Sequence, residues 1–445
     1  MSVDPTRPQP ADRRGPTVDP PPALGEGARR AVAKHQKVRL AEILGVLGPG
    51  IITGSADNDP AGITTYSVVG AQNGFGQNWL LLLATPLLIV VQQMSAHLGN
   101  VTKTDLATLI RTHYGAKIGA FVVLSVVIAN VLTLGADLEM LAAVTGLITG
   151  IKFVYFVVPF AALMVYLSIF VDYKIFARYL LWLGVVFFAY IGSAVLAHPN
   201  WAEALTATII PHVDWSPAYF IGAVGLLGTT ITPYLFFWQA SEEIEGRRGV
   251  QSISRTNLDI AVGMVWSSVI AFFIIVTTGA VLYPHHTDIK SAADAAKALE
   301  PLAGPYAKYL FALGIIGSGL LAIPVIAAST AYPVAGLLGW RRSLGRDARN
   351  APEFYLVLGL AILVGVQFAI AGLDPIKMLF YSQVLDGVIA PMLVVFLVRL
   401  TSTRAVMGDF VNRKAVMVLG WLAVAVLLVA DVALVYSVAA NGWPG

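Results

Sequence analysis

The sequence predicts an all-α protein that crosses a membrane many times. Hydrophobic residues make up 57% of the chain and charged residues only 12%, whereas a soluble domain has about 25% charged residues. From residue 43 onward, mostly apolar stretches of about 20 residues recur, each long enough to cross the ~30 Å hydrocarbon core as a helix. The chain has no cysteine, which excludes disulfides, thiolate metal sites and cysteine nucleophiles.

The first forty residues differ from the rest of the chain. They are rich in Pro, Arg and Ala and contain no apolar run, so they bury too little surface to fold. We therefore expect residues 1–40 to form a disordered cytoplasmic tail, and they also lack the apolar core of a signal peptide. A single membrane domain is expected over residues 41–440, followed by a short extracytoplasmic C-terminus at 441–445.

Eleven transmembrane helices are expected in this membrane domain. Their approximate bounds are 43–70, 78–98, 117–148, 153–171, 175–197, 217–243, 258–283, 305–338, 355–371, 375–399 and 415–440. With the N-terminus in the cytoplasm, every segment on the cytoplasmic side carries Lys or Arg, whereas the opposite segment "AQNGFGQN" carries neither. The positive-inside rule favours this orientation, and an odd number of spans then places the C-terminus outside the cell membrane. The long loop after Tyr283 is expected to form a short amphipathic helix on that outer surface.

Two of the predicted spans are interrupted by residues that break helices. The first contains "ADNDPAG", with Pro60 and Gly62, and the sixth contains "GTTITPYLFF", with Pro233. One proline alone would indicate only a kink. Two breaks at the same position of two five-helix units are instead typical of transporters built from inverted repeats, whose discontinuous helices hold the substrate. Spans 1–5 and 6–10 would form the repeats, with span 11 as an addition.

The residues around the breaks predict a site for a hard cation. Asp57 and Asp59 are intramembrane carboxylates, which are functional by default, but residues two apart cannot face the same way on a helix. Asp59 is the expected ligand, and Asp57 either faces another side of the pore or caps a half-helix. Backbone carbonyls near Ala56, Asp57 and Thr229, together with the hydroxyls of Thr229 and Thr232, can add oxygen ligands. An all-oxygen site without His or Met suits Mg²⁺ or Mn²⁺.

Four further polar residues in the spans are weaker candidates for the same site. The third span holds Asp137 and Glu139 in "GADLEMLAAV", and the tenth holds Gln383 and Asp386 in "YSQVLDGVIAP". Glu139 is a second acidic group that could face the interior, and Gln383 could reach the ion or its water. Polar packing or an interhelical hydrogen bond would explain each of them equally well.

These motifs resemble the natural resistance-associated macrophage protein (Nramp) family of divalent metal transporters. "LGPGIITGSADNDPAG" is similar to the opening of the family's first span, which reads Gly-Pro-Gly and later Asp-Pro-Gly-Asn, and "TTITPYLF" is similar to its Met-Pro-His motif. "ADLEMLAAVTGL" and "YSQVLDGVIAP" fit the third and tenth spans. The resemblance covers residues 41–440. It implies a LeuT-type fold of eleven or twelve helices and, for most members, import of Mn²⁺ and Fe²⁺ with protons.

The chain departs from the family's motifs at three positions. Asp59 and Pro60 match, but Gly62 stands where the family has a metal-binding Asn, Thr232 where it has Met, and Tyr234 where it has His. Loss of the thioether removes a ligand that selects softer metals. The pattern is similar to the divergent Nramp-related branch that includes magnesium transporters, which implies a wider site, a hydrated ion and no proton coupling. Glu139 would then hold water molecules of that ion.

We therefore expect an importer of a divalent cation, Mg²⁺ before Mn²⁺, that needs no cofactor. The metal ion and the lipid bilayer are its expected partners, while the oligomeric state is left open. Neither nucleotide nor nucleic acid is expected, because no GxxxxGK[ST] loop is present and the basic residues are spread over short loops. An enzyme is not expected, since HExxH is absent. The alternatives are a proton-coupled Mn²⁺/Fe²⁺ symporter and a sodium-coupled small-solute transporter, although two acidic residues at a break would repel a carboxylate substrate.

Overall fold

The computed structural model describes residues 49–171, 186–246, 250, 253–341, 344 and 348–442. The predicted tail, the start of the first span, the first half of the fifth span and residues 443–445 lie outside this part of the chain. Regular structure in the described part is entirely helical. The α-helices are α3 (Pro49–Ala56), α4 (Pro60–Asn73), α5 (Asn78–Thr102), α6 (Leu106–Tyr114), α7 (Ala116–Thr149), α8 (Val154–Phe170), α10 (Phe188–Leu196), α11 (Trp201–Ile209), α12 (Pro217–Thr230), α13 (Pro233–Glu245), α14 (Ile253–Val281), α15 (Ala292–Ala296), α16 (Glu300–Ala303), α17 (Ala307–Leu338), α18 (Pro352–Ile370), α19 (Pro375–Ser402), α20 (Arg404–Met407) and α21 (Lys414–Asn441).

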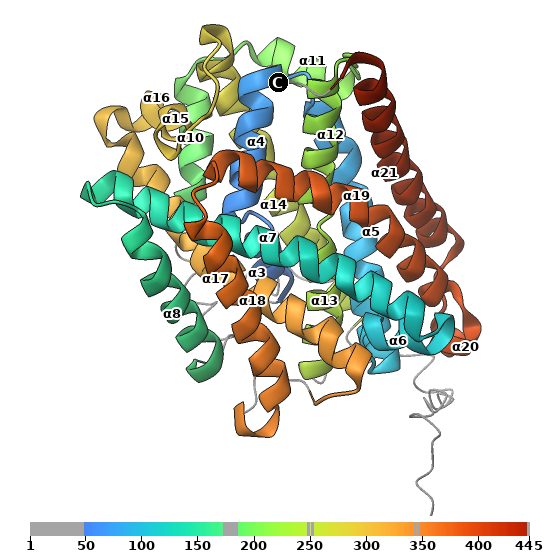
Figure 1. Cartoon of the computed structure of the whole chain (residues 1–445). Coiled ribbons are helices and arrows are strands. Elements are labelled where there is room, and N and C mark those ends of the chain that lie inside the picture. Colours follow the sequence, from blue (N-terminus) through green and yellow to red (C-terminus); the bar gives the residue numbers. More distant parts are fainter. Residues whose placement is uncertain are drawn as a thin grey trace, which may run out of the picture.

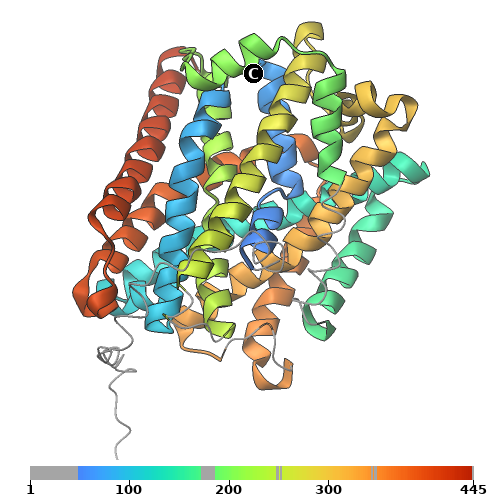
Figure 2. The same ribbon diagram turned by 180° about the vertical axis from the view of Figure 1, so that it is seen from behind.

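The long helices form one bundle around the two broken spans. The helices α7 and α19 cross the bundle obliquely, with α8 and α21 at its two sides (Figure 1). From behind, α14 runs close to α3 and α4 (Figure 2) and packs against both of them. Eight helical segments in the described part are long and apolar enough to cross a membrane. Nearly all residues of α4, α12 and α13, and residues 53–56 of α3, are buried, so the two broken spans lie inside the bundle.

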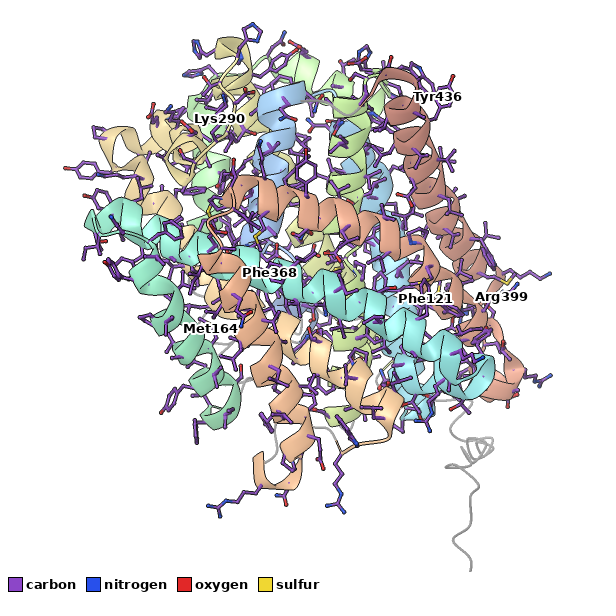
Figure 3. All side chains as sticks on the ribbon, viewed as in Figure 1. Phe121, Met164, Lys290, Phe368, Arg399 and Tyr436 are labelled. Atoms are coloured by element: carbon purple, nitrogen blue, oxygen red, sulfur yellow. The ribbon has the colours of Figure 1, made fainter. Side chains whose placement is uncertain are left out.

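The outer surface of the bundle is apolar. Phe121 on α7 is 64% exposed and Tyr436 on α21 is 66% exposed, and both side chains extend from the ribbon in Figure 3. Large exposed apolar surfaces on a protein mark contacts with a membrane or a partner. Long apolar helices with such outer faces are those of a multi-pass membrane protein.

Both predicted helix breaks are confirmed. The first separates α3 from α4 at residues 57–59, and the second separates α12 from α13 at residues 231–232. Each second half begins with a proline, Pro60 or Pro233, where the missing N–H costs nothing because the first N–H groups of a helix have no intrahelical partner. The prolines in the sequence thus mark the positions at which a new helix begins after each interruption.

Two close helix crossings fix where the breaks lie. A Cβ atom placed on Gly54 of α3 would lie only 2.2 Å from the carbonyl oxygen of Gly263 on α14. A Cβ atom on Gly228 of α12 would lie 2.1 Å from the carbonyl oxygen of Gln383 on α19. Small residues allow such backbone approach between membrane helices. The first break is therefore held against α14 and the second against α19.

The connections differ more from expectation than the spans do. The loop after α14 holds two short helices, α15 and α16, with 3-10 turns at Tyr283–His285, Lys297–Leu299 and Gly304–Tyr306, instead of one amphipathic helix. Pro301 and Gly304, whose φ is +49°, divide the segment. The short surface helices α6 and α11 were not predicted either, because their apolar faces are too short to stand out from the neighbouring spans.

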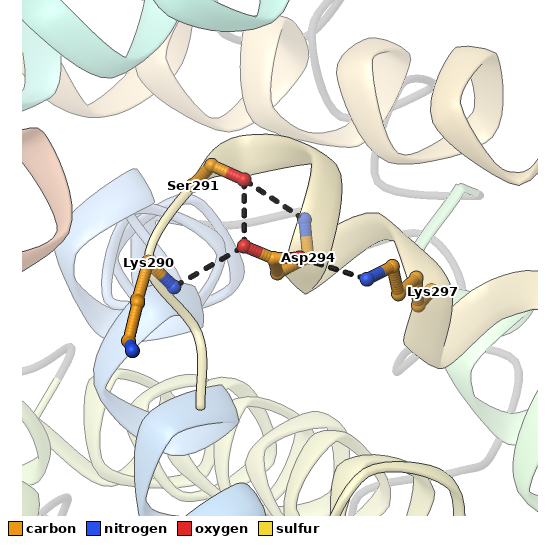
Figure 4. Close-up of polar contacts among 4 residues, drawn as sticks. All are labelled: Lys290, Ser291, Asp294 and Lys297. Atoms are coloured by element: carbon orange, nitrogen blue, oxygen red, sulfur yellow. Dashed lines mark hydrogen bonds and ion pairs between the residues drawn. The ribbon is translucent and has the colours of Figure 1, made fainter. Parts of the chain in front are cut away.

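A small polar network orders the loop before α17 (Figure 4). Ser291 caps α15 by accepting from the backbone N–H of Asp294 at 3.2 Å, and its hydroxyl donates back to the Asp294 carboxylate at 2.7 Å. Lys297 donates to the same carboxylate at 2.8 Å. Burial raises the pKa of Asp294, but the hydrogen bonds from Lys297 and Ser291 outweigh it and hold that pKa below its usual value. The network is therefore intact at neutral pH and is lost only as the pH falls through this lowered pKa.

We predict that Asp294→Asn loosens this loop locally. The change removes the ion pair with Lys297 and one side of the helix cap, worth about 1 kcal/mol. Amide hydrogen exchange at residues 292–296 should become roughly fivefold faster at neutral pH. Asp288→Asn is the matched control, because Asp288 pairs with Lys290 only at 3.8 Å and in solvent. Equal exchange in both variants would contradict the role assigned to Asp294.

Candidate functional site

Asp59 lies at the start of α4 and joins the two broken spans. Its Oδ1 accepts from the backbone N–H of Gly62 at 2.5 Å, so the carboxylate caps the new helix. The hydroxyl of Tyr234, at the start of α13, lies 3.2 Å from Asp59 Oδ2 and 3.2 Å from the Ala56 carbonyl oxygen, and can donate to either. The end of α3, the start of α4 and the start of α13 thus meet at one carboxylate and one hydroxyl.

Three oxygen atoms converge on a small space beside Gly62. A Cβ atom built on Gly62 would lie 2.9 Å from Thr229 Oγ1, 3.0 Å from Asp59 Oδ1 and 3.1 Å from the Asp57 carbonyl oxygen. A side chain at this position would therefore make unusually tight contacts with all three oxygens, and the Thr229 hydroxyl would have to shift. Because residue 62 has no side chain, a carboxylate oxygen, a hydroxyl and a backbone carbonyl oxygen lie close together around it, and oxygens of these kinds are ligands of hard cations.

The Asp57 carboxylate faces away from this point. Its Oδ2 accepts from the Ser267 hydroxyl of α14 at 2.5 Å, and the Asn58 amide donates to the same Ser267 oxygen at 3.1 Å. Asp57 contributes its carbonyl to the space beside Gly62 and its carboxylate to the contact with α14. Of the two positions expected for Asp57, the structure places its side chain on another side of the break.

The threonines at the second break have different roles. Thr229 directs its hydroxyl toward the space beside Gly62. Thr232 precedes α13 without capping it, because its hydroxyl donates to the Thr229 carbonyl at 2.5 Å. Thr230 lies 3.3 Å from the hydroxyl of Tyr66, which comes from α4. The Thr232 hydroxyl and the Thr229 carbonyl are thus bound to each other, while the Thr229 hydroxyl is directed at the oxygen cluster.

Asp137 and Asp386 add two buried carboxylates near the first break. Asp137 Oδ1 accepts from the backbone N–H of Ala61 at 3.0 Å, whereas its Oδ2 has no hydrogen-bond partner in the described part of the chain. The Asp386 carboxylate interacts with the Thr133 hydroxyl. Both carboxylates interact electrostatically with Asp59. Asp57, Asp59, Asp137 and Asp386 are all at most 1% exposed, and none forms an ion pair with a described residue. Such an uncompensated set is costly in a membrane interior and calls for bound cations or protons.

The two remaining candidates from the sequence, Gln383 and Glu139, have different surroundings. Gln383 sits on α19 where that helix crosses Gly228, one residue before Thr229, and its side-chain Oε1 has no partner among the described residues. Glu139 is fully buried on α7, but the carboxylate with which it interacts is Asp374 at the start of α19. The structure thus brings Gln383 to the second break, and places Glu139 within electrostatic range of the like-charged Asp374 at the α19 terminus.

Sequence reasoning missed a polar chain that runs from α3 along α13. Thr53 donates to Gln239 Oε1 at 3.2 Å, Gln239 donates to Glu243 Oε1 at 3.2 Å, and Asn100 of α5 donates to Glu243 Oε2 at 3.0 Å. All four residues are at most 2% exposed. The spacing of Gln239 and Glu243, four residues apart on one helix face, was the available signal. This chain ties the half-helix α3 to α13 and α5.

The two broken helices and the buried polar residues between them define a membrane transporter with a LeuT-type fold. The sequence model of the family described as natural resistance-associated macrophage protein-like matches residues 50–437. The chain therefore belongs to the Nramp family, a family of transporters, and the predicted fold class and family are confirmed.

Solved structures agree with this fold. A manganese transporter of Eremococcus coleocola, in complex with an aromatic bis-isothiourea substituted compound, is similar with a TM-score of 0.74 at 19% identity, over 96% of this chain and 92% of that one. MhsT in complex with L-phenylalanine matches with a TM-score of 0.59 at 13% identity, over 86% of this chain and 98% of that one. A nucleobase-cation-symport-1 family transporter matches with a TM-score of 0.55 at 13% identity, over 89% and 93%.

We predict that Gly62→Ala weakens cation binding. The new methyl group would occupy the point on which the three oxygens converge, and overpacking typically costs about 1–3 kcal/mol. The dissociation constant for Mg²⁺ or Mn²⁺ in calorimetry should rise by roughly tenfold or more. Gly359→Ala on α18 is the matched control, since a Cβ atom there meets nothing within 4 Å. Unchanged affinity in Gly62→Ala would show that cations bind elsewhere.

We predict that Gln239→Leu loosens α3. The change removes the bonds to Thr53 and Glu243, at about 1 kcal/mol each. Because the chain has no native cysteine, Ser55→Cys, at a site that is 4% exposed, can report access to α3. Its labelling by a water-soluble thiol reagent should accelerate about tenfold when Gln239→Leu is added. Gln367→Leu, at an exposed position of α18, should leave the rate unchanged, and an equal rate in both backgrounds would contradict the tether.

Proposed function

We propose that the chain carries a divalent metal cation across the cell membrane by alternating access. The observation that carries this proposal is the convergence of Asp59 Oδ1, Thr229 Oγ1 and the Asp57 carbonyl beside Gly62. These oxygens lie between the ends of broken helices, where transporters of this architecture bind their substrates. The moving body would comprise α3, α4, α5, α12, α13 and α14, and the opposing body α7, α8, α17 and α18.

The ligand chemistry favours Mg²⁺. The three converging atoms are all oxygens, and Thr232 supplies no sulfur at the second break. Within the described part of the chain, no group of three or more His, Asp or Glu side chains can hold a metal ion by itself. A cation here would have few direct protein ligands and would keep much of its water, which suits Mg²⁺ because it dehydrates reluctantly.

Import can be driven by the membrane potential. A divalent cation moving toward an inside-negative cytoplasm gains about 4.6 kcal/mol per 100 mV, twice the ~2.3 kcal/mol of a single charge. The family's usual His is Tyr234 here, and its hydroxyl is directed at Asp59 and Ala56. These features support the proposal that the chain is of the divergent, magnesium-transporter-like type without tight proton coupling. The N-terminal tail would lie in the cytoplasm and residues 441–445 outside.

Manganese is the second candidate. The Eremococcus coleocola structures that share this fold are those of a manganese transporter, and Mn²⁺ also accepts oxygen ligands. In this version of the proposal, metal uptake would be accompanied by protons. The two versions differ in the ion selected and in whether the vesicle interior acidifies.

We predict that the purified protein in liposomes passes Mg²⁺ and that Asp59→Asn abolishes most of this flux. Loss of the charged oxygen ligand should reduce the initial rate at least tenfold, measured with a Mg²⁺-sensitive dye at a fixed membrane potential. Thr232→Met should gain Cd²⁺ flux and lose Mg²⁺ flux, because a thioether favours soft ions.

Asp288→Asn, in the solvent-exposed loop, serves as the control for charge removal and should behave as wild type. Strong Cd²⁺ and Mn²⁺ flux with acidification, and no Mg²⁺ flux, would favour the proton-coupled manganese transporter instead. Absence of flux for every divalent ion would defeat the proposal as a whole.

A further inference from the structure

A second cluster of oxygens lies on the opposite side of the first break from Gly62. It consists of the Asp57 carboxylate and the Asn58 side chain at the end of α3, with the Ser267 hydroxyl of α14 between them. We propose that this cluster, here called the α3–α14 site, binds a monovalent alkali cation at the same time as the divalent ion beside Gly62. Its role in coupling rests on the proposed function, but the binding itself does not.

The oxygens of the α3–α14 site are buried and incompletely satisfied. Asp57 and Ser267 are each 1% exposed and Asn58 is fully buried. Asp57 Oδ1 and Asn58 Oδ1 have no hydrogen-bond partner among the described residues, although both side chains are held by the same Ser267 oxygen. Buried oxygens without partners are expensive, and a cation bound in the seam would offer them a partner.

The backbone around the site leaves the Asp57 side chain little freedom to turn elsewhere. Gly54, one turn earlier on α3, lies against the backbone of Gly263, one turn before Ser267 on α14. The two helices are thus in backbone contact beside the cluster, and the Asp57 carboxylate is confined to their seam. The Asp59 carboxylate is directed instead to Gly62 and Tyr234. The two carboxylates therefore serve different spaces, although they are only two residues apart.

The charge of the site matches one positive charge. A single carboxylate faces the seam, and the other oxygens belong to a neutral amide and a neutral hydroxyl. The site also adjoins the C-terminal end of α3, where the helix dipole and the last carbonyl groups favour cations. Half-helix C-terminal ends coordinate coupling ions in transporters with broken helices. One alkali cation would neutralise this single carboxylate without leaving an excess charge in the seam.

A cation at this site would act on transport through α3. It would neutralise Asp57, bind α3 to α14 and remove the repulsion between the Asp57 and Asp59 carboxylates. It would also order the break at which the divalent ion binds. Because the two cations repel each other, coupled movement requires that this ordering outweigh their repulsion.

The test is the thermal stability of the purified full-length protein in detergent, with NaCl, KCl or choline chloride at constant ionic strength. At saturating NaCl or KCl, the wild-type Tm should rise by at least about 2 °C relative to choline chloride, because a ligand that binds only the folded state stabilises it. Asp57→Asn and Ser267→Ala should lose this shift. Ser268→Ala is the matched control, since the neighbouring Ser268 hydroxyl has no partner in the described part.

A parallel titration with MgCl₂ or MnCl₂ separates this inference from the proposed function. Ser267→Ala should keep the divalent-dependent shift, and Asp59→Asn should lose it while keeping the alkali-dependent one. A wild-type Tm that is equal in NaCl, KCl and choline chloride, or an alkali shift that survives in both Asp57→Asn and Ser267→Ala, would overturn the α3–α14 site. Loss of only the divalent shift in the wild type would instead count against the metal site beside Gly62.

Discussion

A helix that stops in the middle of a membrane leaves backbone groups that water cannot reach, and the Asp59 cap resolves this constraint at the first break. The carboxylate accepts from the Gly62 N–H, and Pro60 removes one further donor that would need a partner. Tyr234 then satisfies the other end of the gap by reaching the Ala56 carbonyl. Because these bonds close the backbone of both half-helices, the chain can stay unwound inside the bundle. The oxygens of Asp59, Thr229 and the Asp57 carbonyl lie together around Gly62 as a result of this arrangement.

The membrane-spanning framework could be read from the sequence because it follows from length and hydropathy. A long apolar run such as that of α7 or α21 must form a helix in lipid, because its backbone groups have no water to bind. Pro60 and Pro233 mark helix starts because of their covalent geometry. The surface helices α6 and α11 could not be found in this way, since their polar faces and short lengths resemble loops. The predicted start of the first span, at residue 43, lies outside the described part of the chain, which begins at residue 49.

The sequence indicated which residues form the candidate site, but not which partners their side chains face. Asp59, Thr229 and the Asp57 carbonyl were candidates because the breaks contain them. The partner of the Asp57 carboxylate, Ser267, is 210 residues away and lies in an apolar run with no distinguishing motif. Its role follows from the contact between Gly54 and Gly263, which is a property of packing. The polar chain through Gln239 likewise depends on how α3, α13 and α5 meet, which no local pattern encodes.

In the proposed site, the two hydrogen bonds of the Asp59 carboxylate would also limit how long an ion stays bound. One of its oxygens is already committed to the Gly62 N–H and the other lies within reach of Tyr234. A carboxylate that is partly neutralised by such donors attracts a cation less strongly than a free one would. A deep trap would slow turnover, since conduction requires binding that is strong enough for the ion to enter and weak enough for it to leave. The capping bond that lets the helix begin inside the bundle would thus also shorten the residence time of the ion, so that one carboxylate would affect both the fold and the turnover.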